Sequence, residues 1–418
     1  MRVTGDEALH CRNNRSKGCS MDLVHLTKLL GLPEFVVTAY TFQEDSSILL
    51  DVKHRHKVAV CPECERVSSE VFEYEERIVR DCSVFDRHCY QRFQGRRFSC
   101  GCCGKPFTER LQSIGFNSGY TKRYEERVFQ LCRENTVAHV SQTEALGYEA
   151  VEGIYTRQAG EAAAARRALF PRVISIDEIS LKKGHKHFVT VISAPEEGCV
   201  IDVLADRKKK TLEAWFDALP EAARQGIQVV CIDMCEIFRD VAREKAPQAE
   251  IVIDRFHVMK NLQEGIDATR RAIQREAEEP QRQDLKGCRW VILKSKDSLK
   301  PEEEERLAHL YEVSPELKVC HELKEEFRSL FNAEQDAETA SQKLSAWEER
   351  VKESGLEKLQ KFLTTLANWR EWILNYFHER ITNGFAEGLN NRIKLIKRRA
   401  FGYTNLEHFR LRILTECV

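Results

Sequence analysis

The chain has 418 residues, 42% of them hydrophobic, and its 65 basic residues are balanced by 66 acidic ones, which gives a formal net charge of −1. This length and hydrophobic content predict a globular protein of two to four folded units. The sequence contains no apolar run of roughly eighteen residues and its start lacks the apolar core of a signal peptide, so we expect neither membrane insertion nor export and take the cytoplasm as the default location. Because the net charge is close to zero, any nucleic-acid contact must come from local clusters of basic residues.

The chain begins with a polar segment and a cysteine-containing module. Residues 1–20 are polar and unpatterned, so we expect a disordered tail, with Met21 as an alternative start to Met1. Residues 21–112 hold short apolar runs with cysteine pairs between them, which is typical of a small β-rich domain. Sixteen cysteines without a signal peptide favour reduced thiols and metal ligands over a disulfide framework.

Two closely spaced cysteine pairs predict a structural Zn²⁺ site in this domain, which resembles a zinc ribbon. Tetrahedral zinc takes four thiolates from paired C-x-x-C hairpins. The predicted ligands are Cys61, Cys64, Cys100 and Cys103. Cys102 is an alternative in the second pair, because C-x-C spacing can replace C-x-x-C at modest geometric cost. Free buried thiols are the competing interpretation of the group.

Residues 120–168 have a helical pattern that is interrupted at Leu146 and Gly147, which predicts a helix-turn-helix segment. The second helix of this segment has few basic residues, which weakens it as a reader of the DNA major groove. A helical linker without a DNA contact therefore stays open as an alternative.

Residues 170–262 alternate between short apolar runs and amphipathic stretches, which predicts an α/β domain with a mixed sheet. Three of the runs end in a carboxylate, at Asp177, Asp233 and Asp254. Acids at the ends of neighbouring strands converge at one edge of a sheet, where clustered carboxylates can hold the two divalent ions that phosphodiester chemistry uses. Oxygen ligands favour Mg²⁺ or Mn²⁺. Any single one of these residues could instead begin a turn or cap a helix.

Residues 263–377 carry no strand signals, and serine–proline helix starts within them predict an all-helical insertion. The tryptophans of this region lie at helical spacing beside Leu and Ile, so we expect them in the core and not on a base-stacking surface. They are Trp290, Trp347, Trp369 and Trp372.

Residues 378–418 return to the catalytic domain with an amphipathic helix that contains Glu387. Amide and basic side chains follow this acid at helical intervals, so one face of the helix carries an acid, amides and bases. A DNA phosphate along this face would meet the metal at one end and the bases beyond it. A solvated charged face is the alternative for the run at residues 397–399.

Three segments resemble the transposases of the bacterial insertion-sequence family ISL3: I-D-E-I-S-L-K-K-G-H from residue 176, I-D-R-F-H-V-M-K-N from residue 253, and T-N-G-F-A-E-G-L-N-N-R-I-K-L-I-K-R-R-A-F-G-Y from residue 382. The resemblance covers nearly the whole chain from Met21. It implies an RNase H-like core interrupted by a helical insertion, with Asp177, Asp233 and Glu387 as catalytic acids.

The resemblance also gives Asp254 and His257 a supporting role near the active site, although Asp254 remains the main rival of Asp233. A helix-face histidine bonded to a neighbouring carboxylate is the competing interpretation of His257. The zinc domain of the family is inferred to hold the DNA ends of the mobile element. The residues predicted to contact DNA are Arg96, Arg97, Asn390, Asn391, Arg392, Lys394, Lys397, Arg398 and Arg399.

The sequence therefore predicts a DNA transposase that uses two Mg²⁺ or Mn²⁺ ions for strand cleavage and strand transfer, with DNA as its partner. Cutting two element ends together requires two active sites, so we expect a homodimer or a larger oligomer on DNA. Two alternatives remain: a zinc-dependent DNA-binding regulator with an inert nuclease-like domain, and a stand-alone RNase H-like nuclease that cuts without joining.

Overall fold

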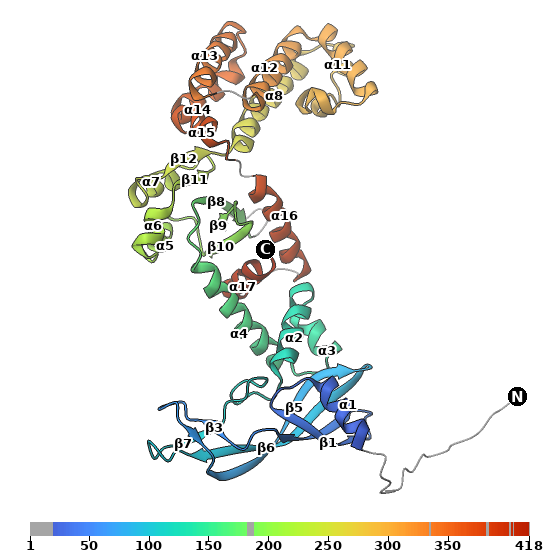
Figure 1. Ribbon diagram of the computed structural model, residues 1–418. Coiled ribbons are helices and arrows are strands. Elements are labelled where there is room, and N and C mark those ends of the chain that lie inside the picture. Colours follow the sequence, from blue (N-terminus) through green and yellow to red (C-terminus); the bar gives the residue numbers. More distant parts are fainter. Residues whose placement is uncertain are drawn as a thin grey trace, which may run out of the picture. The chain divides into compact units, whose positions relative to one another are not determined.

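The computed structural model describes residues 20–181, 188–333, 336–381, 384–400, 403 and 405–417 (Figure 1). The chain divides into two compact units, Met1–Gln158 and Ala159–Val418, and the division falls within helix α4 (Tyr148–Arg167). The tail predicted for residues 1–20 lies outside the described residues except for Ser20, which begins α1 (Ser20–Leu30). Among the helices described, none is long and apolar enough to cross a membrane.

The first unit is built on a five-stranded sheet with the order β1-β2-β6-β5, and β7 pairs with β6. A separate two-stranded ribbon pairs β3 with β4. The strands are β1 (Phe35–Phe42), β2 (Ile48–His54), β3 (Ala59–Val60), β4 (Val67–Ser68), β5 (Val71–Val84), β6 (Arg87–Ser99) and β7 (Pro106–Thr108). Phe85 and Asp86 join β5 to β6 with φ values of 50° and 62°, the positive values that a two-residue hairpin turn requires.

Three helices complete this unit, α2 (Lys122–Glu134), α3 (Val137–Thr143) and α4, and only α4 extends past its boundary. Thr121 and Thr136 cap the first two, because their hydroxyls accept hydrogen bonds from backbone N–H groups in the first turn. The short connection after α3 contains Ala145 in the left-handed region, with φ of 48°. The predicted break at Leu146 and Gly147 therefore lies where one helix ends and the next begins.

The second unit confirms the predicted mixed α/β core. Its sheet has the order β10-β9-β8-β11-β12, in which β8, β9 and β10 are antiparallel neighbours and β8, β11 and β12 are parallel. The strands are β8 (Val173–Ser180), β9 (Phe188–Ala194), β10 (Cys199–Leu204), β11 (Val229–Ile232) and β12 (Glu250–Ile253). These strands are apolar on both faces because helices cover both sides of the sheet.

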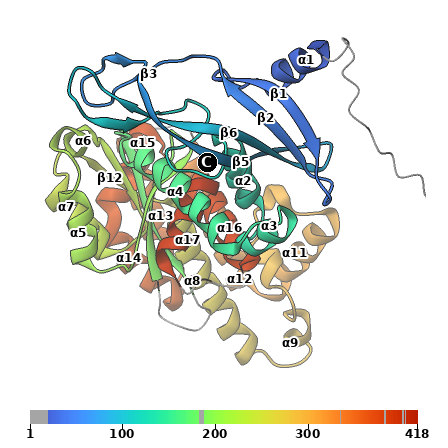
Figure 2. The same cartoon turned by 90° about the horizontal axis from the view of Figure 1, so that it is seen from below.

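Two groups of helices lie on opposite sides of this sheet, as Figures 1 and 2 show. One side carries α5 (Lys209–Asp217), α6 (Glu221–Gly226) and α7 (Glu236–Lys245). The other side carries α16 (Gly384–Arg399) and α17 (Leu406–Glu416), with α16 beside β8 and α17 beside β10.

Between β12 and α16 the described residues form helices and no strand. These elements are α8 (Arg255–Glu276), α9 (Gln281–Asp284), α10 (Arg289–Leu293), the 3₁₀ helix η1 (Lys296–Ser298), α11 (Pro301–Val313), α12 (Pro315–Asn332), α13 (Ala337–Glu353), α14 (Glu357–Leu374) and α15 (Tyr376–Glu379). Their apolar side chains share one core with the sheet. Trp347 and Trp369 lie in this core and Trp372 packs against it, as expected, but Trp290 is 68% exposed. The prediction for Trp290 is wrong because the short α10 buries Val291 and Ile292 and turns the preceding residue outward.

Candidate active site

Three parallel strands bring the three predicted aspartates to one level of the sheet. Asp233 and Asp254 follow β11 and β12, whereas Asp177, predicted at a strand end, lies within β8, which continues to Ser180. Ile176, Ile232 and Ile253 are register partners across β8, β11 and β12, and an aspartate follows each of them. Residues in the same register project toward the same face of a sheet. Asp177 and Asp233 lie with His257 in a group whose ligand atoms are all within 4.8 Å of one another.

The carboxylate of Asp177 is buried and held at both oxygens. Its Oδ1 accepts a hydrogen bond of 2.7 Å from the backbone N–H of Glu178, and its Oδ2 accepts one of 2.8 Å from Nδ2 of Asn390 in α16. Each oxygen keeps a further lone pair. Asp177 is therefore oriented by the protein while it can still bind an ion.

The carboxylate of Asp233 is suited to bind a cation. Its Oδ1 is buried and has no hydrogen-bond partner among the described residues. Burial raises the pKa of Asp233 to about 6, with nearby Asp177 acting in the same direction and His257 opposing it. A buried carboxylate oxygen without a donor is costly unless a cation or water meets it. The donor set of carboxylate oxygens fits a hard divalent cation.

Asp254 occupies a different position, at the start of α8. Its Oδ1 accepts a hydrogen bond of 3.2 Å from the backbone N–H of Phe256, and its Oδ2 lies 3.1 Å from Nδ1 of His257. This hydrogen bond raises the pKa of His257, against the effect of its burial. One oxygen of Asp254 is therefore bonded to the first turn of α8 and the other to the imidazole of His257.

The predicted third acid, Glu387, belongs to α16, but its side chain lies outside the described residues. The other residues of α16 that were predicted to contact DNA fall into two groups, those bonded within the protein and those exposed. Lys397 donates to the carbonyl oxygen of Ser180 over 3.3 Å, and Arg399 donates to both carboxylate oxygens of Glu416 at 2.5 and 2.6 Å. The exposed members are Asn391, Arg392, Lys394 and Arg398.

The structure brings the four predicted zinc ligands together in the first unit. The Sγ atoms of Cys61 and Cys103 are 3.7 Å apart and those of Cys64 and Cys100 are 3.4 Å apart, and all four lie within 4.8 Å of one another. Backbone N–H groups of Cys103 and Cys102 lower the pKa of the Cys100 thiol to about 6, which favours the thiolate that zinc binds. Cys102 is exposed and does not belong to the group.

The two cysteine loops have matching backbones. The first follows β3 and the second follows β6, and in each the fifth residue returns a hydrogen bond of 2.9 Å to the carbonyl oxygen of the first cysteine. These fifth residues, Glu65 and Gly104, have φ values of 57° and 68°. Both loops therefore direct backbone N–H groups and two thiols toward one point, which is a suitable site for a tetrahedral metal.

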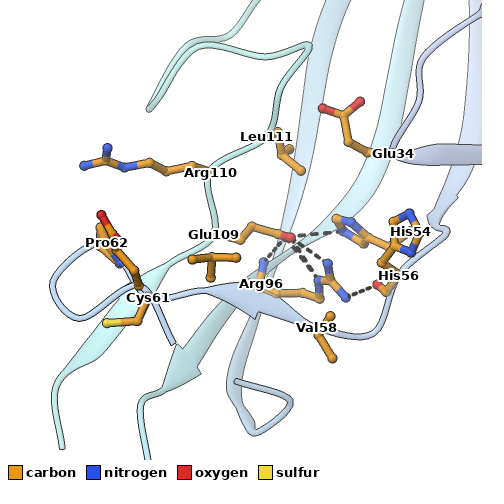
Figure 3. Close-up of a pocket in the computed structure, with 13 residues that line it drawn as sticks. Glu34, His54, His56, Val58, Cys61, Pro62, Arg96, Glu109, Arg110 and Leu111 are labelled. Carbon is orange, nitrogen blue, oxygen red and sulfur yellow. Dashed lines mark hydrogen bonds and ion pairs between the residues drawn. The ribbon is translucent and has the colours of Figure 1, made fainter. Parts of the chain in front are cut away.

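Arg96 and Arg97, both predicted to contact DNA, have opposite environments. Arg96 is buried, and its guanidinium donates to both carboxylate oxygens of Glu109 and to the carbonyl oxygen of His56 (Figure 3). These groups line a cavity of about 470 Å³ beside Cys61. Arg97 is exposed and lies 3.2 Å from the equally exposed Glu73.

Two contacts in these sites were not predicted from the sequence, which assigned Asn390 to DNA contact and gave Glu109 no role. The Asn390–Asp177 contact joins residues 213 positions apart, and the only local signal is that Asn390 lies about one turn after Glu387. Glu109 has no local signal, because a glutamate near the end of a strand reads as a solvated residue. Only the fold reveals these partners.

Comparison with known proteins extends along almost the whole chain. The family profile described as "Transposase" matches residues 174–413, and the profile described as "Helix-turn-helix domain of transposase family ISL3" matches residues 109–159. The chain is similar to the transposase for insertion sequence element IS1001 of Bordetella parapertussis, with 31% identity over 400 residues, 94% of this chain and 98% of that protein. It is also similar to the transposase for insertion sequence element IS1557 of Mycobacterium tuberculosis, with 26% identity over 255 residues, 56% of this chain and 57% of that protein.

Proposed function

Because the chain belongs to the transposase family ISL3, we propose that its DNA cleavage and strand transfer are carried out by Asp177, Asp233 and Glu387. The protein is a DNA transposase of the DDE type, an enzyme that binds DNA and uses divalent metal ions. The observation that carries the residue assignment is the convergence of Asp177 and Asp233 from adjacent parallel strands, with their ligand atoms within 4.8 Å.

We infer that the catalytic core is RNase H-like and consists of residues 170–262 and 378–418, with residues 263–377 as a helical insertion. Three antiparallel strands followed by two parallel ones, in the order β10-β9-β8-β11-β12, support this assignment. The first acid then comes from the central strand, the second from its parallel neighbour, and the third from a helix beside the central strand.

In the proposed mechanism, each residue of the site has a separate task. Two Mg²⁺ or Mn²⁺ ions bound by the three acids would activate the attacking oxygen, first of water and then of the freed 3′ hydroxyl, and stabilise the leaving oxygen. Asp177 and Asp233 contribute carboxylates whose positions the sheet fixes. Asp254 orients His257 through Nδ1, and this hydrogen bond raises the pKa of the imidazole. This pair supports the acids without replacing them.

We infer that residues 21–112 form a zinc-ribbon-like domain in which one Zn²⁺ is held by Cys61, Cys64, Cys100 and Cys103. Residues 120–168 supply the helix-turn-helix, and together these segments bind the terminal repeats of the element. On the catalytic unit, the exposed residues of α16, Asn391, Arg392, Lys394 and Arg398, suit DNA phosphates. Arg96, Lys397 and Arg399 make the internal contacts described above, so we leave them out of the DNA-contacting set.

Excision of the element with its own flanking DNA from a plasmid in a bacterial host tests the assignment. Asp177→Asn, Asp233→Asn and Glu387→Gln should each reduce excision by at least about a hundredfold, since each removes a charged metal ligand. Asp254→Asn should weaken it less, because Asp254 acts through His257. Loss with Asp254→Asn and survival with Asp233→Asn would transfer the second acid to Asp254.

The same system separates the rival functions. Purified protein that cuts the element ends but forms no joined product would indicate a nuclease. Protein that binds the ends but neither nicks them with Mg²⁺ or Mn²⁺ nor responds to the acid substitutions would indicate a DNA-binding regulator.

A further inference from the structure

Asn390 joins the helix that contains the third proposed acid to the strand that contains the first. Its Nδ2 donates a hydrogen bond of 2.8 Å to Oδ2 of Asp177. The other oxygen of this carboxylate is held by the backbone N–H of Glu178 at 2.7 Å. With one hydrogen bond to each oxygen, rotation of the Asp177 carboxylate about its Cβ–Cγ bond is restrained at both ends.

A second contact shows that this arrangement follows from the course of α16 along β8. Lys397 bonds the carbonyl oxygen of Ser180. From Asn390 to Lys397 the helix advances about 10.5 Å, and from Asp177 to Ser180 the strand advances about 10 Å. The two elements therefore run in the same direction with matching rise, and buried Leu389, Ile393 and Ile396 pack α16 in place between the two contacts.

The other half of the Asn390 amide has no partner in the described part of the chain. Its Oδ1 is buried and has no hydrogen-bond partner among the described residues. An unpaired buried acceptor is unfavourable, and it offsets much of what the hydrogen bond to Asp177 contributes to stability. The amide at this position is therefore better explained by its contact with Asp177 than by the folding of α16.

We propose that Asn390 is a positioning residue that fixes the Asp177 carboxylate for metal binding, and that it is not a contact to DNA. This inference rests on the proposed function of Asp177. Residues that orient a metal ligand typically change metal affinity or activity by about 10–100-fold when they are replaced. Asn391, the next residue, is exposed and stays in the proposed DNA-contacting set, so the two asparagines have different tasks.

Asn390→Leu tests this role because leucine keeps the size of the side chain but loses both the donor and the unpaired acceptor. We expect a melting temperature close to that of the wild type, because the loss of the unpaired acceptor offsets the loss of the donor to Asp177, together with a 10–100-fold increase in the Mn²⁺ concentration needed for half-maximal nicking. The rise in melting temperature that Mn²⁺ produces should shrink, which is a binding measurement independent of activity. Affinity for the DNA ends, measured without divalent ions, should stay within about twofold of the wild type.

Asn391→Leu is the matched control: it should weaken binding of the DNA ends and leave the Mn²⁺ requirement unchanged. Asn390→Ala gives the same loss of the donor if leucine does not fit, and it should also raise the Mn²⁺ requirement. An Asn390 variant that keeps the wild-type Mn²⁺ requirement, or that loses DNA affinity as Asn391→Leu does, would overturn the inference. Asp177→Asn is measured in parallel: if it still nicks DNA, the proposed function fails and not the role of Asn390 alone.

Discussion

At the scale of single residues, Arg96 and Arg97 illustrate how neighbours of the same type take different roles. β6 is a strand, so consecutive side chains project to opposite faces. The Arg96 side chain is 9% exposed and its partner Glu109 is 6% exposed, whereas Arg97 and Glu73 are about half exposed. Arg96 thus belongs to the interior of the first unit, and only Arg97 is accessible to a DNA phosphate.

Alanine substitutions at these two positions should separate stability from DNA binding. Arg96→Ala leaves the buried Glu109 carboxylate without its guanidinium partner, with the backbone N–H of residue 96 and His54 still beside it, so we expect it to lower the free energy of unfolding of the first unit by about 3 kcal/mol. Arg97→Ala removes an exposed ion pair and should change stability by less than about 0.5 kcal/mol. Arg97→Ala should instead reduce the salt dependence of DNA binding by about one phosphate contact.

Denaturant unfolding of the full chain and DNA titrations over a range of salt concentrations provide the two measurements. A strongly destabilised Arg97→Ala protein would contradict the structural distinction. So would an Arg96→Ala protein that unfolds as the wild type does and loses DNA affinity.

At the scale of elements, the cysteine loops have only a small core of their own, which is why we propose that they depend on a metal. The buried cluster there consists of two of the cysteines with Phe98 and Phe107, and a few partly buried residues pack against it. So few apolar side chains supply little folding energy, and structural zinc contributes directly to the folding of such modules.

Replacing a proposed zinc ligand should therefore unfold this region. We expect Cys61→Ser and Cys103→Ser to lose the zinc and the affinity for the DNA ends, while the melting transition of the catalytic unit persists. Cys102→Ser is the matched control: the thiol is exposed and outside the group, so zinc content and DNA affinity should be retained. Elemental analysis and calorimetry of the purified full chain measure both effects. Retention of zinc by Cys103→Ser together with its loss from Cys102→Ser would support the C-x-C alternative.

The elements also show which structural features can be predicted from the sequence alone. Asp177 and Asp233 could be predicted because an apolar strand-like run followed by an acid is a local pattern, and parallel register then brings the acids together; the continuation of β8 past Asp177 to Ser180 was not predicted. The cysteine pairs were equally local. Contacts between distant residues, such as Asn390 with Asp177, depend on the packing of whole elements. The polar residues on one face of α16 look alike in the sequence. Only the fold shows which of them bond within the protein and which are exposed.

At the scale of the whole molecule, the charge distribution matches a protein that binds DNA through restricted surfaces. The net charge is −1, so general attraction to DNA is weak, and we propose that the exposed bases of α16 and Arg97 provide local contacts. Such surfaces suit an enzyme that becomes active when it is assembled on specific ends. We therefore keep a DNA-assembled homodimer, with one active site for each end, as the proposed assembly.

Mixing active and inactive subunits tests this assembly. If each subunit of a dimer cuts one end, a mixture of equal amounts of wild type and Asp177→Asn protein forms about one quarter of its complexes with two active subunits. Cleavage of both ends should then fall to about a quarter of the wild-type level. The fraction of all ends that are nicked should fall only to about half. Monomers that cut both ends in succession would reduce both products to about half. A dimer in which one active subunit suffices would leave double-end cleavage near three quarters of the wild-type level.

Equal DNA binding by the two proteins must be verified first, because these fractions assume that the subunits assemble at random. If double-end cleavage then falls with the square of the wild-type fraction across several mixing ratios, each end is cut by its own active site.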